Sequence, residues 1–320
     1  MRATRPRSVY NRGMVKIAVL ASFNMDLVMR AARRPGAGET LQGEFAMHLG
    51  GKGFNQAVAA RRLGAQVAVI GRVGDDPFGR HFLEALDREG IDATGVVTDA
   101  DEGTGVASIT VEPDGGNSIV QAPRANRRLD AADVAANAAA LAGAGVAMLQ
   151  LETSMPAAIA FARAARDAGA ITLLNPAPAA PVPEALLALT TIIAPNEIEA
   201  RALTGMGEPG SEGAFAMAGD LLKLGPRGAL ITLGADGAVA CADGLRLHAQ
   251  RFEVPVVDTV GAGDAFCAAL AVRLAEGADL AEALWFANAA GALACTRAGA
   301  EPSMPTRSQV DALVTRGVHP

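Results

Sequence analysis

The chain has 320 residues, of which 50% are hydrophobic, 4% aromatic and 19% charged. This composition is typical of a globular protein, and the length suffices for one large α/β domain or two smaller ones. The formal net charge of −6 argues against nucleic-acid binding, which usually requires a basic surface.

The start of the chain is rich in arginine and contains no acidic residue before the first apolar segment. We interpret residues 1–13 as a disordered extension or as the result of a misplaced start, because Met14 directly precedes that segment. A transit peptide is the alternative. No apolar run approaches the roughly 18 uncharged residues of a membrane span, so we expect none.

Residues 15–21 form a nearly continuous apolar run, which predicts a central strand of a parallel sheet. Asn24 and Asp26 follow its carboxyl end, where ligands gather in open α/β sheets. Their polar groups suit a polyhydroxylated sugar, whereas an Asx-turn is the simpler alternative. No G-x-G-x-x-G turn follows the strand, which argues against a dinucleotide site.

A glycine-rich cluster, Gly50-Gly51-Lys52-Gly53-Phe54-Asn55-Gln56, joins a predicted strand at residues 41–49 to a predicted helix that ends near Gly64. The cluster lacks the G-x-x-x-x-G-K-[ST] pattern of a P-loop. On residue type alone, its lysine is interpreted as a solvated side chain at a helix start.

A strand at residues 67–73 and a helix after it are predicted next. We expect Asp76 to be the N-cap, Pro77 the first helical residue and Gly90 the end of that helix. Asp75 and Asp76 are therefore interpreted as structural residues.

Residues 104–111 and 117–120 flank Glu112-Pro113-Asp114-Gly115-Gly116 and predict a β-hairpin, because these turn residues tolerate positive φ angles. Together with the strand at residues 41–49, the hairpin is expected to form a small sheet that is separate from the main one.

Strand and helix patterns then alternate, which is typical of βαβ units and a parallel sheet. The predicted strands are residues 146–151, 171–174, 191–194, 229–232 and 238–241, and the predicted helices are residues 156–168 and about 196–203. The fold class is therefore α/β, with a mostly parallel sheet covered by helices on both faces.

Asn196 and Glu199 lie one turn apart at the start of a predicted helix, on the same helix face. A hydrated Mg²⁺ ion is typically held by one or two carboxylates together with substrate phosphates. Acidic residues are also favoured at helix starts by the helix dipole alone, and this alternative stays open.

The stretch Asp258-Thr259-Val260-Gly261-Ala262-Gly263-Asp264 follows an apolar segment and precedes a predicted helix that ends near Gly277. Two glycines at a helix start leave backbone N–H groups uncovered, which suits a phosphate or a developing oxyanion. A carboxylate beside them can take a proton from an incoming hydroxyl. The alternative is that Asp264 serves only as an N-cap. A long alanine-rich helix, from residue 280 to about 297, is expected after this stretch.

The three cysteines, Cys241, Cys267 and Cys295, are odd in number and lack metal-site spacing. We interpret them as buried thiols of a protein in a reducing compartment, the cytoplasm. The four histidines are scattered, which argues against a histidine-based metal site.

The two glycine clusters together resemble the two signatures of the ribokinase family, the phosphofructokinase-B-type carbohydrate kinases. The resemblance covers nearly all of the chain from about Met14 onward. It implies a three-layer α/β/α catalytic domain over residues 14–320, with a lid from about residues 24–50 and 99–126. The implied activity is ATP-dependent phosphorylation of a sugar hydroxymethyl group, D-ribose at O5 first among the candidates, by a cytoplasmic homodimer that associates through the lid.

The resemblance also implies a set of site residues. The sugar ligands would be Asn24, Asp26, Gly50, Gly51, Lys52, Asn55, Glu152 and Asp264. The base would be Asp264, beside the anion-binding amides of Gly261, Ala262, Gly263 and Asp264 itself. The nucleotide would contact Asn196, Thr232, Gly234, Gly237, Gly263 and Asn288. A K⁺ ion would be bound by Asp258, Val260, Ala294, Arg297, Gly299 and Ser303, and Mg²⁺ by Asn196 and Glu199 through water.

One departure from the family pattern leaves the sugar preference open. The family usually has Gly-Ala-Asn after the hairpin, and this chain has Arg124-Ala125-Asn126. The arginine is expected to place a charge at the lid hinge or at the pocket edge.

Alternative functions remain on this pattern. Deoxyribose, a keto-deoxy sugar acid or a nucleoside are other acceptors within the family, although the low aromatic content does not favour a nucleoside. A non-catalytic sugar-binding protein on the same fold is a further alternative, against which the complete Gly-Ala-Gly-Asp sequence argues. A dinucleotide-dependent dehydrogenase lacks support, because the sequence has no matching glycine turn after a strand.

Overall fold

A computed structural model describes residues 14–113, 116–205 and 210–317 of the chain. The extension expected at residues 1–13 and the hairpin tip at residues 114–115 lie outside the described residues. Most apolar runs of the sequence form strands, listed here in chain order. They are β1 (Lys16–Leu20), β2 (Asn24–Arg30), β3 (Glu44–Gly50), β4 (Gln66–Gly74), β5 (Asp92–Asp99), β6 (Gly105–Val111), β7 (Asn117–Ala122), β8 (Val146–Leu149), β9 (Ile171–Leu174), β10 (Ile192–Ile193), β11 (Gly228–Thr232), β12 (Ala238–Ala242) and β13 (Leu245–Ala249).

These strands form two separate sheets. The larger has nine strands in the order β13-β12-β11-β10-β9-β8-β1-β4-β5, and the smaller has four in the order β3-β2-β6-β7. All neighbours from β5 to β11 pair in parallel, and β12 and β13 are added antiparallel. The predicted parallel sheet and the predicted second sheet are both confirmed.

Helices cover both faces of the larger sheet. Successive side chains of its buried strands point to opposite faces, so both faces are apolar and each forms a core with the helices that cover it. Ile17 and Val19 of β1 belong to one core cluster, and Ala18 and Leu20 belong to the other. The first cluster is completed by α1 (Lys52–Arg62), α2 (Pro77–Glu89), α9 (Ala262–Ala275), α10 (Leu280–Ala294) and α11 (Arg307–Arg316). The second is completed by α4 (Ala131–Ala136), α5 (Met155–Asp167), α6 (Glu184–Leu187), α7 (Glu197–Thr204) and α8 (Gly210–Lys223).

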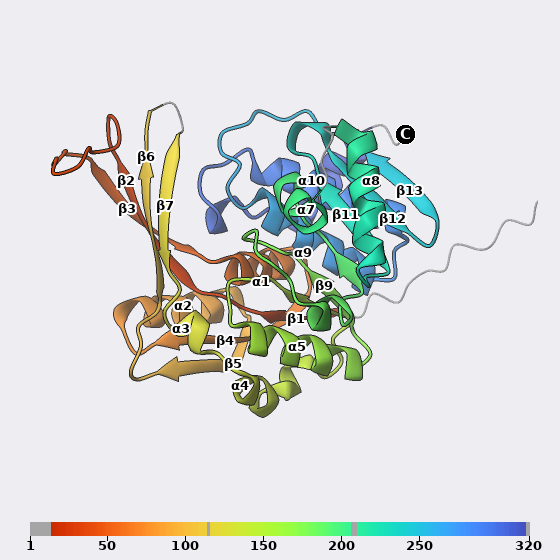
Figure 1. The fold of residues 1–320 in the computed structure, drawn as a ribbon, viewed down its shortest axis with the longest axis horizontal. Coiled ribbons are helices and arrows are strands. Elements are labelled where there is room, and N and C mark those ends of the chain that lie inside the picture. The colour runs from red at the N-terminus through yellow and green to blue at the C-terminus, as the bar shows by residue number, and fades with distance from the viewer. Residues whose placement is uncertain (1–13, 114–115, 206–209, 318–320) are drawn as a thin grey trace, which may run out of the picture.

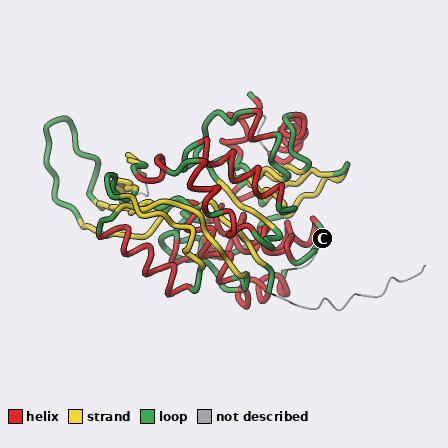
Figure 2. Tube along the Cα trace, turned by 90° about the horizontal axis from the view of Figure 1, so that it is seen from below, coloured by secondary structure: helices red, strands yellow, loops and turns green. Residues whose placement is uncertain are grey.

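The smaller sheet extends away from the α/β body as an arm (Figure 1). The loop between β2 and β3 continues past the ends of the strands, as the green loop at the left of Figure 2 shows. The hairpin of β6 and β7 forms as predicted. β2 pairs with both β3 and β6 and so unites the predicted strand and hairpin in one sheet.

Several expectations on local structure need correction. Asn24 and Asp26 lie in β2, so the Asx-turn interpretation of this segment is wrong. The long alanine-rich helix, α10, ends at Ala294 instead of near residue 297. The boundaries of α2 agree with the prediction, with Asp76 as N-cap accepting from Gly79 N and Gly90 left-handed at its end.

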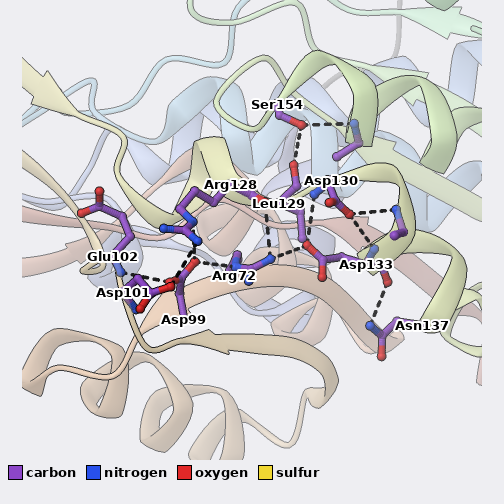
Figure 3. A network of polar contacts seen from close by, with 12 residues as sticks. Arg72, Asp99, Asp101, Glu102, Arg128, Leu129, Asp130, Asp133, Asn137 and Ser154 are labelled. Atoms are coloured by element: carbon purple, nitrogen blue, oxygen red, sulfur yellow. Dashed lines mark hydrogen bonds and ion pairs between the residues drawn. The ribbon is translucent and has the colours of Figure 1, made fainter.

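The base of the arm is held by a buried carboxylate at the end of β5 (Figure 3). Asp99 is 2% exposed and accepts hydrogen bonds from the backbone amides of Asp101 and Glu102. It also pairs with Arg72 of β4 at 2.8 Å and with Arg128 of the short helix α3 (Ala125–Arg128) at 3.0 Å. These contacts fix the position at which the chain leaves β5 of the larger sheet and continues toward the smaller sheet.

Candidate active site

The two glycine clusters, although they are about 200 residues apart in sequence, meet through α1 and α9, which pack against each other. Gly51 adopts a φ of 97°, and a Cβ there would lie 2.5 Å from the Ser22 carbonyl oxygen. Only glycine therefore lets the start of α1 approach the end of β1 this closely.

Asp264 lies in the first turn of α9 with only 6% of its surface exposed. Its Oδ2 accepts from Asn55 Nδ2 at 3.1 Å, and its Oδ1 accepts from Gln56 Nε2 at 3.0 Å. Burial raises the pKa of Asp264, opposed by the charge of Lys52 and by these two hydrogen bonds. The interpretation of Asp264 as the N-cap is wrong, because Gly261 holds that position and Asp264 makes no capping hydrogen bond.

The backbone amides at the start of α9 are available to a ligand. The N–H groups of Gly263 and Asp264 donate to no carbonyl group within the described part of the chain. A Cβ on Gly263 would meet no atom within 4 Å, so this position faces open space. Gly261 is left-handed, with φ of 81°, and a side chain there would collide with Met304. Uncovered amides at the positive end of a helix form an anion site.

Two buried amide side chains near Asp264 have unused hydrogen-bonding atoms. Asn24 is 2% exposed, and its Oδ1 accepts from Asn126 Nδ2 at 3.0 Å, but its Nδ2 has no partner among the described residues. Asn55 is 5% exposed, and its Oδ1 likewise has none within the same ranges. Buried polar atoms are normally paired, so this free donor and free acceptor indicate a polar ligand.

Asp26 and Glu152 add carboxylates to the same region. Glu152 Oε2 accepts from Ser22 Oγ at 2.6 Å and from the backbone amide of Lys52 at 2.8 Å. Its Oε1 accepts from Gln121 of β7 at 3.2 Å, so the arm reaches the site. Burial, with a smaller contribution from the Glu152 charge, raises the pKa of Asp26 to about 7.

Gly50 and Lys52 lie next to these carboxylates. A Cβ at Gly50 would collide with the Asp26 carboxylate, so a larger residue there would displace that group. Burial disfavours the charged form of Lys52, but the nearby carboxylates of Asp264, Glu152 and Glu199 outweigh this effect and raise its pKa. Lys52 is therefore a cation within the site, and its interpretation as a solvated helix-start lysine is wrong.

Asn196 and Glu199 cap α7 reciprocally. Asn196 Oδ1 accepts from Glu199 N, and Glu199 Oε2 accepts from Asn196 N, both at 2.9 Å. Glu199 is 7% exposed and burial raises its pKa. Its second oxygen makes no hydrogen bond to a described residue, so one carboxylate oxygen is available to a hydrated cation. No cluster of three or more metal-ligating His, Cys, Asp or Glu side chains occurs within the described ranges.

The expected nucleotide residues lie on several elements. Thr232 forms a parallel bridge with Asn196 at the end of β11. Gly234 and Gly237, both with positive φ, flank the short turn that follows. Asn288 of α10 donates to the carbonyl oxygen of Gln250 at 2.7 Å, so its amide supports the segment after β13. Within the described ranges, Asn288 makes no hydrogen bond to Thr232, Gly234 or Gly237.

The expected cation residues come from two segments that Asp258 joins. Its Oδ2 accepts from Gly299 N at 2.9 Å, and its Oδ1 accepts from Val260 N at 3.1 Å in an Asx-turn. Ser303 is buried and donates to the Ala300 carbonyl at 2.8 Å. Within the described residues, the carbonyl groups of Arg297 and Gly299 accept no hydrogen bond. Free carbonyl oxygens beside a carboxylate fit a large monovalent cation, and Ala294 contributes the end of α10 nearby.

The charge of Arg124 is directed toward the base of the arm. Its Nε donates to Glu102 Oε1 at 3.0 Å, its Nη1 donates to the Thr104 carbonyl at 3.2 Å, and Asp76 lies 4.0 Å away. Its φ of 45° is one that glycine adopts more readily. Of the two expected positions, the structure therefore supports the hinge.

Sequence reasoning missed several residues of the site. Asn126 binds both the amide and the carbonyl group of Phe23, and it orients Asn24. Gln56 binds the Asp264 carboxylate, and Ser22 binds Glu152. Gln56 and Asn126 belong to motifs that the sequence analysis quoted, but residue type alone does not reveal their partners.

Comparisons with known proteins identify the family to which the chain belongs. The model of the pfkB family carbohydrate kinases matches residues 14–307. A ribokinase of Haemophilus influenzae is 39% identical over 294 residues, which cover 92% of this chain and 96% of the relative. A deoxyribokinase of Salmonella typhi is 34% identical over 295 residues, which cover 92% of this chain and 96% of that protein.

Solved structures give the same result for the fold. The structure of Arabidopsis thaliana ribokinase complexed with ribose and ATP superimposes with a TM-score of 0.87 at 33% identity, covering 94% of this chain and 99% of that one.

Within the described ranges, no helix is both long and apolar enough to cross a membrane.

Proposed function

The chain belongs to the pfkB family of carbohydrate kinases, and we propose that it transfers the γ-phosphoryl group of ATP to the 5-hydroxyl group of D-ribose. One observation carries the proposal. Among the described residues, a buried carboxylate, uncovered helix-start amides and two amide side chains with one unpaired polar atom each meet at one end of the larger sheet. The ribokinase relatives support ribose as the acceptor.

In this proposal Asp264 is the general base. The sugar oxygen attacks the γ-phosphorus, the bond to the bridging oxygen of ADP breaks, and the hydroxyl proton passes to the Asp264 carboxylate. The backbone amides of Gly261, Gly263 and Asp264 stabilise the negative charge on the transferred group, whereas the expected Ala262 amide already donates to the Thr259 carbonyl group at 3.3 Å. Most of the rate gain comes from positioning the hydroxyl in line with the phosphate.

The sugar hydroxyl groups pair with the unused polar atoms of the site. Asn24 Nδ2 donates to one hydroxyl and Asn55 Oδ1 accepts from another. Asp26, Lys52 and Glu152 bind the remaining hydroxyl groups, and Gly50 and Gly51 let the backbone approach the sugar. The arm made of residues 24–50 and 99–126 acts as the lid, which the Gln121–Glu152 hydrogen bond supports.

The nucleotide occupies the neighbouring strand ends. Asn196, Thr232, Gly234, Gly237, Gly263 and Asn288 contact ATP. Glu199 and Asn196 would hold Mg²⁺ through water, and the bound ion would supply positive charge to the phosphates. A K⁺ ion would be held by Asp258, Val260, Ala294, Arg297, Gly299 and Ser303.

The oligomeric state and the cellular location complete the proposal. The enzyme works as a homodimer that associates through the lid, which an exposed apolar face of that sheet supports. We place it in the cytoplasm, because none of the three cysteines is in a disulfide and a reducing compartment suits free thiols.

Turnover of Asp264→Asn tests the role of the base. We expect kcat to fall about 10²–10⁴-fold, as is usual when a general base is removed. ATP affinity should change little. Because Asp264 does not cap α9, the melting temperature depends on whether the Asn amide can pair with both Asn55 and Gln56, and it must be measured alongside. A variant that kept more than about a tenth of wild-type kcat would exclude Asp264 as the base.

A sugar panel in a coupled ADP-release assay tests the acceptor. The deoxyribokinase relative makes deoxyribose the specific competitor. We expect the highest kcat/KM with D-ribose. A higher value with deoxyribose, a keto-deoxy sugar acid or a nucleoside would change the substrate, and no turnover with any sugar would favour a binding protein.

A further inference from the structure

The carboxylate of Asp264 lies at the end of a chain of buried side-chain amides. Gln56 is fully buried, and its Nε2 donates both to Asp264 Oδ1 at 3.0 Å and to Asn175 Oδ1 at 3.2 Å. Its Oε1 accepts from Gln150 Nε2 at 2.5 Å. Asn175 Nδ2 donates in turn to the Ala194 carbonyl at 2.9 Å. Every polar atom of the Gln56 side chain therefore has a protein partner, which leaves none for the sugar.

The chain of amide side chains connects the Asp264 carboxylate to the carboxyl ends of three strands of the larger sheet. Gln150 directly follows β8, Asn175 directly follows β9, and Ala194 directly follows β10. These three strands are neighbours in the sheet. Gln56, which comes from α1, therefore links the C-terminal ends of these strands to the side chain of Asp264 on α9.

The partners of Gln56 also determine its orientation. A flipped Gln56 amide would turn its oxygen toward the carboxylate of Asp264 and its NH₂ group toward the Gln150 NH₂ group. Both contacts would then be repulsive, so only the observed orientation satisfies the chain. Misplacing a catalytic group by about 1 Å can cost on the order of 10² in rate.

We propose that Gln56 is a positioning residue that fixes the plane of the Asp264 carboxylate, with Gln150 and Asn175 holding Gln56 in place. The proposal rests on the proposed function, in which Asp264 is the base. A purely structural role for the same amides is the competing explanation, since a buried hydrogen-bond network also stabilises the fold.

The charges around Asp264 give the two explanations different pH dependences. Lys52 of α1, Glu152 after β8, Glu199 of α7 and Cys267 of α9 face this region. A donor to the ionised carboxylate lowers its pKa, so loss of the Gln56 amide raises the pKa of Asp264. The base works only when it is ionised. The acid limb of the kcat–pH profile should therefore move to higher pH.

The experiment compares Gln56→Leu, Gln150→Leu and Phe161→Leu with wild type. Phe161 is a fully buried residue of α5 in the other core cluster, so its variant loses stability without contacting Asp264. For Gln56→Leu we expect kcat about 10–100-fold lower, KM for ribose and ATP within about threefold, and the acid limb at higher pH. Gln150→Leu should shift the same limb in the same direction by less, because Gln56 loses its anchor but keeps its donor.

The outcomes separate the explanations. If the acid limb of Gln56→Leu coincides with that of Phe161→Leu and wild type, Gln56 only stabilises the fold and the proposal is overturned. If Gln56→Leu does not fold, Gln150→Leu decides between the same two results. A kcat of Asp264→Asn above about a tenth of the wild-type value would instead overturn the proposed function, and it is measured separately.

Discussion

Among single residues, Asp26 has the most informative electrostatics. Its pKa rises from 3.8 to about 7 because the side chain is buried and Glu152 is close. The folded state therefore binds this proton more tightly than the unfolded state does. Between about pH 4 and pH 7 stability falls as the pH rises, and above that window the unfavourable term is constant. A carboxylate that destabilises the free protein is expected where a ligand provides the missing partners.

The affinity for ribose should depend on the ionisation of Asp26. A sugar hydroxyl donates to the ionised carboxylate, so binding favours the deprotonated form. We expect the dissociation constant to rise as the pH falls from 8 to 6, by up to about tenfold per pH unit below the pKa. Titration calorimetry at several pH values measures this change. Asp26→Asn is the control and should bind weakly with no such slope, whereas a wild-type affinity that is flat over this range would contradict the role.

At the residue scale, the sequence predicted groups whose chemistry is visible in their type and spacing. The Asp264 carboxylate and the adjacent glycines belong to this class. Gln56 does not, because its role depends on three strand ends that only the order of the folded sheet brings together. Glu199 was ambiguous for a physical reason: the same residue completes a capping box and has a second carboxylate oxygen without a hydrogen bond to a described residue.

At the scale of elements, long apolar segments were predictable and partly exposed strands were not. β1 is buried over most of its length, whereas β5 and β13 mix polar and apolar residues and have exposed positions. β2 was missed because its polar residues at 24 and 26 look like a turn until β3 and β6 pair with it. Strand formation here depends on neighbours more than on propensity.

The contact between Asp258 and the loop that follows α10 leads to a prediction about monovalent cations. Asp258 already ties the start of the α9 region to Gly299, and a K⁺ ion on the free carbonyl groups would add a fixed positive charge beside the anion site. We therefore expect higher kcat in K⁺ than in Na⁺ at equal ionic strength. Steady-state rates in matched chloride salts measure the difference.

A variant without the carboxylate provides the control for the cation. Asp258→Asn retains the hydrogen-bonding shape toward Val260 and Gly299 in part but loses the negative charge. The ratio of the K⁺ rate to the Na⁺ rate should approach one in this variant. Equal wild-type rates in both salts would remove the cation site from the proposal.

At the scale of the whole molecule, the two faces of the smaller sheet differ. Residues that pair directly across strands share a face. Asn24 and Asp26 of β2 therefore share one face with Gln121 of β7, which reaches Glu152. The opposite face, which we call the outer face, contains Met29, Phe45, Met47 and Val120, exposed by 47%, 58%, 48% and 76%. A group of exposed apolar side chains on one face is typical of an interaction site.

We expect the outer face to form the dimer contact. The arm extends away from the α/β body (Figure 1), which leaves room for a second copy beside the smaller sheet. A buried charge opposite apolar residues is costly, so Phe45→Glu and Val120→Glu should each convert the dimer to a monomer in sedimentation velocity. Leu245→Glu is the matched control, because Leu245 is 55% exposed on the edge strand β13 of the larger sheet. If Leu245→Glu dissociates the dimer while Phe45→Glu and Val120→Glu do not, the contact lies on the larger sheet. A wild-type protein that sediments as a monomer would exclude the lid dimer altogether.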